Sequence, residues 1–437
     1  MQDYSVIFII VNSCLLYKIF RCKKVHTLLK ILLGVSYFGW NAVPAILMSF
    51  PAISEVTSTT PLYIFCSYVN QTFLFFTYLI AYILIKRRPV PSFIKMRDFQ
   101  NSKRLLNLFV NVAFILALYK SLTLLTSTFS YLESNDLENA TVGGPIDFLG
   151  GFSMSFITGT IFFFRKKVSF AKFYLCVSIM VFYWLILTFR GGRIYIFGIV
   201  ILLLYYALIK RSKTILILGI LTGLFALTLL PALASLRGAD NVNTAEVINE
   251  SKSSSSEMVV DQILGKTNSV NNGSYLIQYD GIGNNGYMMY TSTIYALIPR
   301  IIYPSKPEPG SVDGTLTGLP SRRAAIYQIT GEYDGVFNLG ISTSLSSLWG
   351  GGWLMYFVEI ISSAFLIFLL NSVFRSRKMI FITFAMSLLN YPICILEIPL
   401  PTILISVQRY TVIYFILSFI CHKPTKSNLR YKRKHIH

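Results

Sequence analysis

The sequence predicts an all-α polytopic membrane protein. Hydrophobic residues make up 54% of the 437-residue chain and charged residues only 13%, whereas about a quarter of the residues of a soluble protein are charged. Apolar runs of roughly 20 residues, the length that crosses a bilayer as a helix, recur along the chain. This composition excludes an ordinary soluble enzyme, a disordered protein and a disulfide-rich secreted domain.

The apolar runs predict about eleven membrane-spanning helices. They lie at 4–20, 27–50, 61–85, 105–126, 146–164, 170–189, 194–209, 214–236, 349–371, 379–397 and 402–420. The first run has no basic segment before it, so it does not read as a cleavable signal peptide. We expect an N-terminal bundle of eight spans in 1–236, a large extracytoplasmic loop in 237–348, a bundle of three spans in 349–420 and a basic tail in 421–437.

The net charge of +20 is distributed unevenly along the chain. Six groups at alternate ends of the predicted helices contain 28 of the 39 basic residues and one acid, Asp98. By the positive-inside rule these groups mark the cytoplasmic side, which places the N-terminus outside and the C-terminus inside. The positive charge therefore orients the helices and gives no indication of nucleic-acid binding. The groups lie within 18–30, 86–104, 165–172, 210–213, 375–378 and 423–434.

The predicted loop at 237–348 is the longest segment outside the spans. A serine run at 253–256 predicts a flexible first part. The aromatic-rich stretch at 287–304 is too interrupted to span a bilayer, which predicts that it lies along the membrane surface or re-enters the membrane. The loop leads to three glycines at 350–352. A loop of this length is usually functional.

Several cationic residues on the predicted outer side depart from the positive-inside rule. Arg190 and Arg193 occupy a short hairpin between two spans, and Arg409 lies inside the last span. Arginine binds phosphate with a bidentate fork, so this set indicates a site for a lipid-linked phosphate or pyrophosphate. The alternative partners are lipid headgroups and acids of the loop. The set also includes Arg237, Arg300, Lys306, Arg322 and Arg323.

Glu359 is a second ionisable residue inside a predicted span. A charged group in a membrane usually faces a partner or a cavity. Glu359 and Arg409 therefore either pair as a structural lock, or Arg409 faces the same cavity as Arg190. The four histidines all lie on the predicted inner side, and the six cysteines form no CxxC motif. We therefore expect no metal site and no cofactor.

Three motifs lie in or beside the loop: FRGGR at 189–193, IPRIIYPSKP at 298–307 and GEYDGVFNLG at 331–340. They resemble elements of the Wzy-type O-antigen polymerases, which polymerise the oligosaccharide repeat units of bacterial envelopes. The second motif resembles the Pro-Arg…Pro-x-Lys-Pro element of that family. The third resembles its glutamate followed by an Asn-(Phe/Leu)-Gly element, although the stretch that begins at Asp334 has no counterpart in the pattern.

The resemblance implies a glycosyltransferase-C-like fold in the bacterial inner membrane. The enzyme would transfer a growing glycan from undecaprenyl pyrophosphate onto the next lipid-linked repeat unit, with a polysaccharide chain-length regulator as a partner protein. The cationic residues would bind the pyrophosphate. Glu332 would act as the general base, with Asp334 as the second choice, and Asn338 would contribute to substrate binding.

Two other classes share part of this pattern. A flippase for lipid-linked oligosaccharide needs many spans and a cationic interior, but it does not need so long an outer loop. An O-antigen ligase shares the fold and the loop, but ligases of that family rely on an outer histidine, and this chain has none on the predicted outer side.

Overall fold

The computed structural model describes most of the predicted helical bundle. It covers residues 3–42, 61–89, 103–134, 145–189, 196–223 and 342–389, with single positions at 91, between 270 and 303, and between 398 and 407. Every regular element in these residues is a helix, and no strand occurs among them. The all-helical class is confirmed for this part of the chain. A helix suits lipid because it pairs its backbone N–H and C=O groups within one segment.

Four helices of the described residues are long and apolar enough to cross a membrane, by length and composition. They belong to α5 (Pro61–Arg87), α6 (Lys103–Ser134), α8 (Phe170–Phe189) and α16 (Thr343–Ser376), and each coincides with a predicted span. The first predicted span corresponds to α1 (Asp3–Arg21). Shorter apolar helices coincide with five further spans. These are α2 (Thr27–Tyr37), α7 (Pro145–Phe163), α9 (Ile196–Lys210), Lys213–Gly223 and α17 (Met379–Leu388).

The span count of about eleven stays a prediction. Of the last predicted span, 402–420, the structure describes only positions 403, 404 and 407. The second predicted span, 27–50, is described up to residue 42, where α2 continues into a short π-helix, η1 (Phe38–Ala42).

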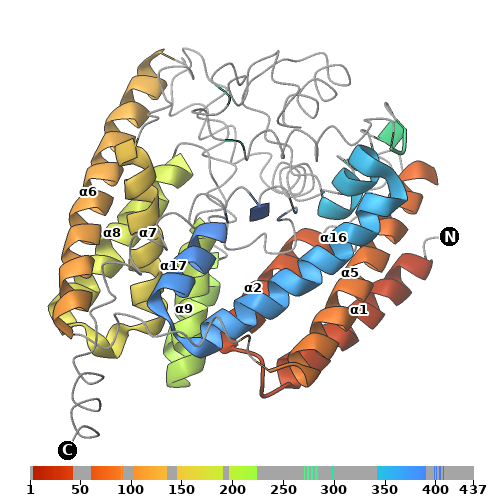
Figure 1. The fold of residues 1–437 in the computed structure, drawn as a ribbon, viewed down its shortest axis with the longest axis horizontal. Coiled ribbons are helices and arrows are strands. Elements are labelled where there is room, and N and C mark those ends of the chain that lie inside the picture. The colour runs from red at the N-terminus through yellow and green to blue at the C-terminus, as the bar shows by residue number, and fades with distance from the viewer. Residues whose placement is uncertain are drawn as a thin grey trace, which may run out of the picture.

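The described helices pack in two groups (Figure 1). In one group α16 lies along α5, and α5 packs on α1. In the other, α6 and α17 both pack on α7, and α8 contacts α6, α7 and α9. The two groups are joined by α2, which contacts α1, α16 and α9, and by the left-handed turn at Arg377 that leads from α16 to α17. One cluster of buried apolar side chains therefore includes residues of both groups.

Glycines allow close helix packing in the second group. A Cβ atom at Gly159 of α7 would lie 2.8 Å from Cγ2 of Ile382 in α17. A Cβ atom at Gly198 of α9 would lie 2.8 Å from Cε2 of Trp184 in α8. Small residues let helix backbones approach in membranes, where packing and hydrogen bonds drive association. A larger residue at either position would force the helices apart.

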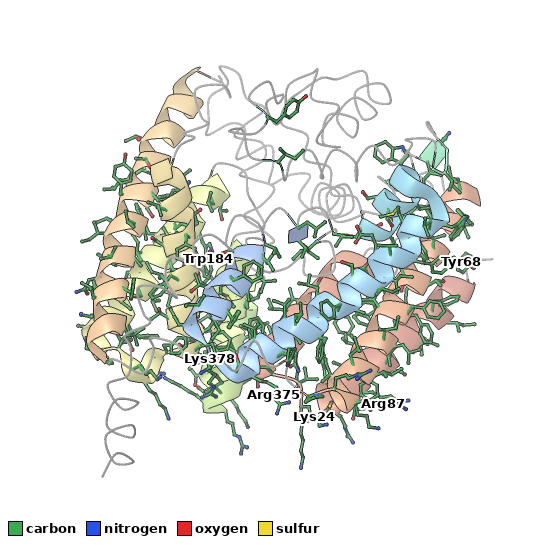
Figure 2. The ribbon with its side chains drawn as sticks, in the orientation of Figure 1. Lys24, Tyr68, Arg87, Trp184, Arg375 and Lys378 are labelled. Atoms are coloured by element: carbon green, nitrogen blue, oxygen red, sulfur yellow. The ribbon has the colours of Figure 1, made fainter. Side chains whose placement is uncertain are left out.

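Basic residues from separate parts of the chain gather at one end of the bundle. Figure 2 shows Lys24, Arg87, Arg375 and Lys378 at this end, which we call the basic end. They lie after α1, at the end of α5, in the last turn of α16 and directly before α17. The Lys24 ammonium donates a hydrogen bond of 2.6 Å to the carbonyl of Lys86. This grouping agrees with the prediction that these segments share one side of a membrane.

The segment between α1 and α2 is fixed to α16 at the basic end. The Asn371 amide accepts a hydrogen bond of 2.9 Å from the His26 N–H and donates one of 3.1 Å to the Lys24 carbonyl. His26 is also the N-cap of α2, because its Nδ1 accepts from the Leu28 N–H over 3.2 Å. The Asn371 side chain therefore holds a turn from the other end of the sequence against α16.

The His26 imidazole is held neutral in this position. Its ring stacks on Phe163, with 5.3 Å between the centroids. Burial is the main cause that lowers the pKa of His26 to about 4, and the nearby positive charges of Arg377 and Arg375 contribute to the same shift. His26 lies at the basic end, so it belongs to the structural packing there and not to the predicted outer site.

Candidate functional site

The predicted site residues lie outside the described part of the chain. They are Arg190, Arg193, Arg237, Arg300, Lys306, Arg322, Arg323, Glu332, Asp334, Asn338 and Arg409. Whether they converge therefore stays a prediction. The structure does describe elements that adjoin them. These are α8, which ends directly before Arg190, parts of the stretch 270–283, the N-terminal part of α16, and positions at the start of the last predicted span.

A break interrupts α16 at the glycines that follow the predicted loop. Gly351 has φ −162° and ψ 17°, and Gly352 has φ 63° and ψ −158°, so neither residue is helical. The helix therefore consists of a short piece, 343–350, and a long piece, 353–376. At 1.5 Å per residue the long piece spans about 36 Å, which is sufficient to cross a hydrocarbon core of about 30 Å. The break consequently lies far from the basic end, where α16 ends.

Part of the predicted loop packs against the short piece of α16. Val270 and Ile277 are buried and belong to the hydrophobic core, although they come from the stretch predicted to be outside the bundle. The Gly283 N–H donates a hydrogen bond of 3.1 Å to the carbonyl of Leu348 in α16. Val270, Ile277 and Gly283 are therefore in contact with the bundle.

A buried polar cluster lies beside the short piece of α16. The Asn70 side chain in α5 donates a hydrogen bond of 2.8 Å to Asn41 in η1 and accepts one of 2.7 Å from the Ser344 hydroxyl. The Ser342 and Ser344 hydroxyl oxygens are 3.0 Å apart. All four side chains are buried. Hydrogen bonds of this kind join helices in lipid, so the cluster fixes η1, α5 and α16 relative to one another.

Glu359 binds the segment that precedes the last predicted span. Its side chain is 0% exposed. Both carboxylate oxygens accept the backbone N–H of Leu400, at 2.9 and 3.0 Å. A carboxylate is favourable near the N-terminus of a helix, where unpaired N–H groups point outward. Glu359 thus fixes Leu400, which precedes the last predicted span, to α16. The predicted pairing of Glu359 with Arg409 lies outside the described residues.

The buried polar cluster has a signal in the sequence that our prediction did not use. Asn41 and Asn70 are amides within apolar runs, and a polar group inside a membrane needs a partner. The described residues contain no group of three or more His, Cys, Asp or Glu that could hold a metal ion.

Comparisons of the chain with family models, curated proteins and solved structures give no match. The described structure therefore defines the class by fold alone. In its described residues the chain is all-helical, with four helices long and apolar enough to span a membrane.

Proposed function

We propose that this protein is an oligosaccharide repeat-unit polymerase of the Wzy type, a membrane glycosyltransferase with about eleven spans and a glycosyltransferase-C-like fold. The main support is the presence of Arg190, Arg193 and Arg300 on the predicted outer side, where orienting charges are not needed. The three motifs at 189–193, 298–307 and 331–340 contain these arginines and the candidate acid Glu332.

In the proposed reaction a hydroxyl of the acceptor repeat unit attacks the anomeric carbon of the growing glycan. The bond from that carbon to undecaprenyl pyrophosphate breaks, and the pyrophosphate leaves with the electron pair. The hydroxyl proton passes to Glu332. Because negative charge builds up on the leaving group, Arg190, Arg193, Arg300 and Arg409 would stabilise the transition state more than the ground state.

The arrangement of the described helices supports the proposed orientation. The basic end gathers residues from several helix ends (Figure 2). The break in α16, where Gly283 makes its contact, is separated from it by about 36 Å of helix. A polymerase with its large loop outside, in the bacterial inner membrane, requires such a separation. In this proposal the N-terminus lies outside, the C-terminal tail is cytoplasmic, and no cofactor is needed.

Arginine-to-alanine variants test the anion-binding role. Cells that lack their own copy of the gene would be complemented with Arg190→Ala, Arg193→Ala or Arg300→Ala, and surface glycan would be resolved by gel electrophoresis. We expect each variant to insert normally but to yield glycan of a single repeat unit in place of long ladders. Arg88→Ala is the matched control, because Arg88 is exposed and directly follows α5 at the basic end. Normal ladders in all three variants would refute the anion-binding role.

The same assay separates a polymerase from a flippase and tests the base. Deletion of a flippase leaves no surface glycan, whereas deletion of a polymerase leaves single repeat units. Glu332→Gln is expected to retain binding of the lipid-linked substrate and to lose polymerisation, because the amide cannot accept the hydroxyl proton. Full activity of this variant would move the base role to another residue, with Asp334 as the next candidate.

A further inference from the structure

The contact between the predicted loop and α16 joins two backbone positions that both require glycine. Gly283 has φ +73° and Gly352 has φ +63°, values in the left-handed region that other residues adopt only at a cost. A Cβ atom at Gly283 would lie 3.3 Å from both Cα and N of Gly352. A side chain at Gly283 would therefore be strained by its own backbone and would press on the backbone of α16.

A second contact fixes the start of the same stretch. A Cβ atom at Gly273 would lie 2.5 Å from Cδ1 and 2.7 Å from Cβ of Leu345 in the short piece of α16. The Gly281 N–H donates to the Ile277 carbonyl over 2.9 Å, which closes a helical turn before the chain reaches Gly283. Gly273 and Gly283 thus both contact α16. In the sequence the buried Val270 precedes Gly273, and the buried Ile277 lies between the two glycines.

The break in α16 lies at the point of contact. The Leu348 carbonyl accepts the Gly283 N–H over 3.1 Å, and the non-helical residues Gly351 and Gly352 follow directly in the chain. In an unbroken helix the N–H of residue 352 bonds this carbonyl. At the break, the Leu348 carbonyl therefore accepts the N–H of Gly283 in the place where an unbroken helix would use the N–H of Gly352.

We propose that Val270, Gly273, Ile277 and Gly283 form a loop anchor, and that this anchor and the break in α16 open and close as one cooperative unit. When the anchor separates from α16, the Leu348 carbonyl loses a donor and Val270 and Ile277 lose their packing. When the break straightens, the backbone of Gly352 loses its contact with Gly283. This inference does not rest on the proposed enzymatic activity.

Amide hydrogen exchange with mass spectrometry tests the coupling on the full chain in lipid nanodiscs. In the native protein we expect peptides that cover 277–283 and 342–352 to be protected and to open at the same rate. Coupling between two sites is reciprocal. Gly283→Ala should therefore accelerate exchange in 342–352, and Gly352→Ala should accelerate exchange in 277–283, each by about tenfold, the effect of placing alanine at a left-handed position.

Gly151→Ala is the matched control for these variants. A Cβ atom at Gly151 of α7 would meet nothing within 4 Å, so its exchange pattern should equal that of the native protein. Peptides of α5 and α6 should stay unchanged in the Gly283→Ala and Gly352→Ala variants. Unprotected exchange of 277–283 in the native protein would overturn the inference without reference to any variant. Acceleration restricted to the mutated segment, or spread equally over α5 and α6, would also overturn it.

Discussion

Replacing Glu359 with alanine should destabilise the protein by about 2–3 kcal/mol, because it removes a buried charged acceptor and leaves the partly buried N–H of Leu400 without this acceptor. Glu359 is fully buried, and both of its oxygens accept the Leu400 N–H. Leu400 stands between Pro399 and Pro401, and proline has no N–H. Leu400 is thus the one residue of these three that can donate a backbone hydrogen bond, and no neighbouring N–H in this stretch can replace it.

Glutamine at position 359 should cost less than alanine, about 1 kcal/mol. Its side chain has the same shape and keeps one oxygen that can accept the Leu400 N–H, although the charge is lost. The expected order of stability is therefore native, then Glu359→Gln, then Glu359→Ala. Unfolding in mixed micelles, followed by circular dichroism as the fraction of denaturing detergent rises, measures this order.

The control comes from the same helix, one turn further on. Ser363 is 3% exposed, and its buried hydroxyl has no hydrogen-bond partner among the residues that the structure describes. Ser363→Ala should therefore change the stability by less than about 0.5 kcal/mol. Equal stabilities of Glu359→Ala and Ser363→Ala would show that the bond to Leu400 contributes nothing, and the reasoning would be wrong.

Two further predictions concern the basic end and the polar cluster. Because the folded pKa of His26 is lowered from 6.5 to about 4, the unfolded chain binds more protons in this range. The free energy of unfolding should fall by about 1–2 kcal/mol as the pH drops from about 6.5 to about 4, after allowance for partial exposure; equal pH dependence in His26→Gln would contradict this. Asn70→Leu and Ser344→Ala should show a coupling energy of about 0.6 kcal/mol in a double-mutant cycle, the average for such bonds in membranes. Simple additivity would mean that their hydrogen bond of 2.7 Å adds no stability.

The sequence predicted the long helices well because lipid permits few alternatives. A segment that exposes backbone polar groups to hydrocarbon is unstable, so a long apolar run has to be a helix. α5, α6, α8 and α16 all follow this rule. Lys24, Arg87, Arg375 and Lys378 gather at one end of the bundle. The sequence predicted this, because each belongs to a basic group beside a predicted span.

Contacts between distant segments could not be predicted in the same way. The glycines at 350–352 were visible in the sequence as the end of the loop, but the residue that meets them, Gly283, is separated from Gly352 by many positions. Val270 stands among polar residues, and the apolar run that ends at Ile277 has only three residues, 275–277, so nothing local indicates that they are buried. Glu359 was expected to face a partner or a cavity, with Arg409 as the candidate partner. Its contact with the Leu400 backbone could not be predicted, because it depends on where the chain returns to α16. The convergence of the predicted arginines depends on the same kind of long-range geometry.

α16 makes contacts to both parts of the chain that adjoin the predicted site. At its break it binds Gly283, which precedes Arg300 in the sequence, and at Glu359 it binds Leu400, which precedes Arg409. Gly352 and Glu359 are seven residues apart, which corresponds to about 10 Å along a helix. Two stretches more than a hundred positions apart are therefore fixed within a short length of one helix. If the arginines do act on one pyrophosphate, the position of α16 determines how they meet, and variants at Gly352 and Glu359 should then impair the same step.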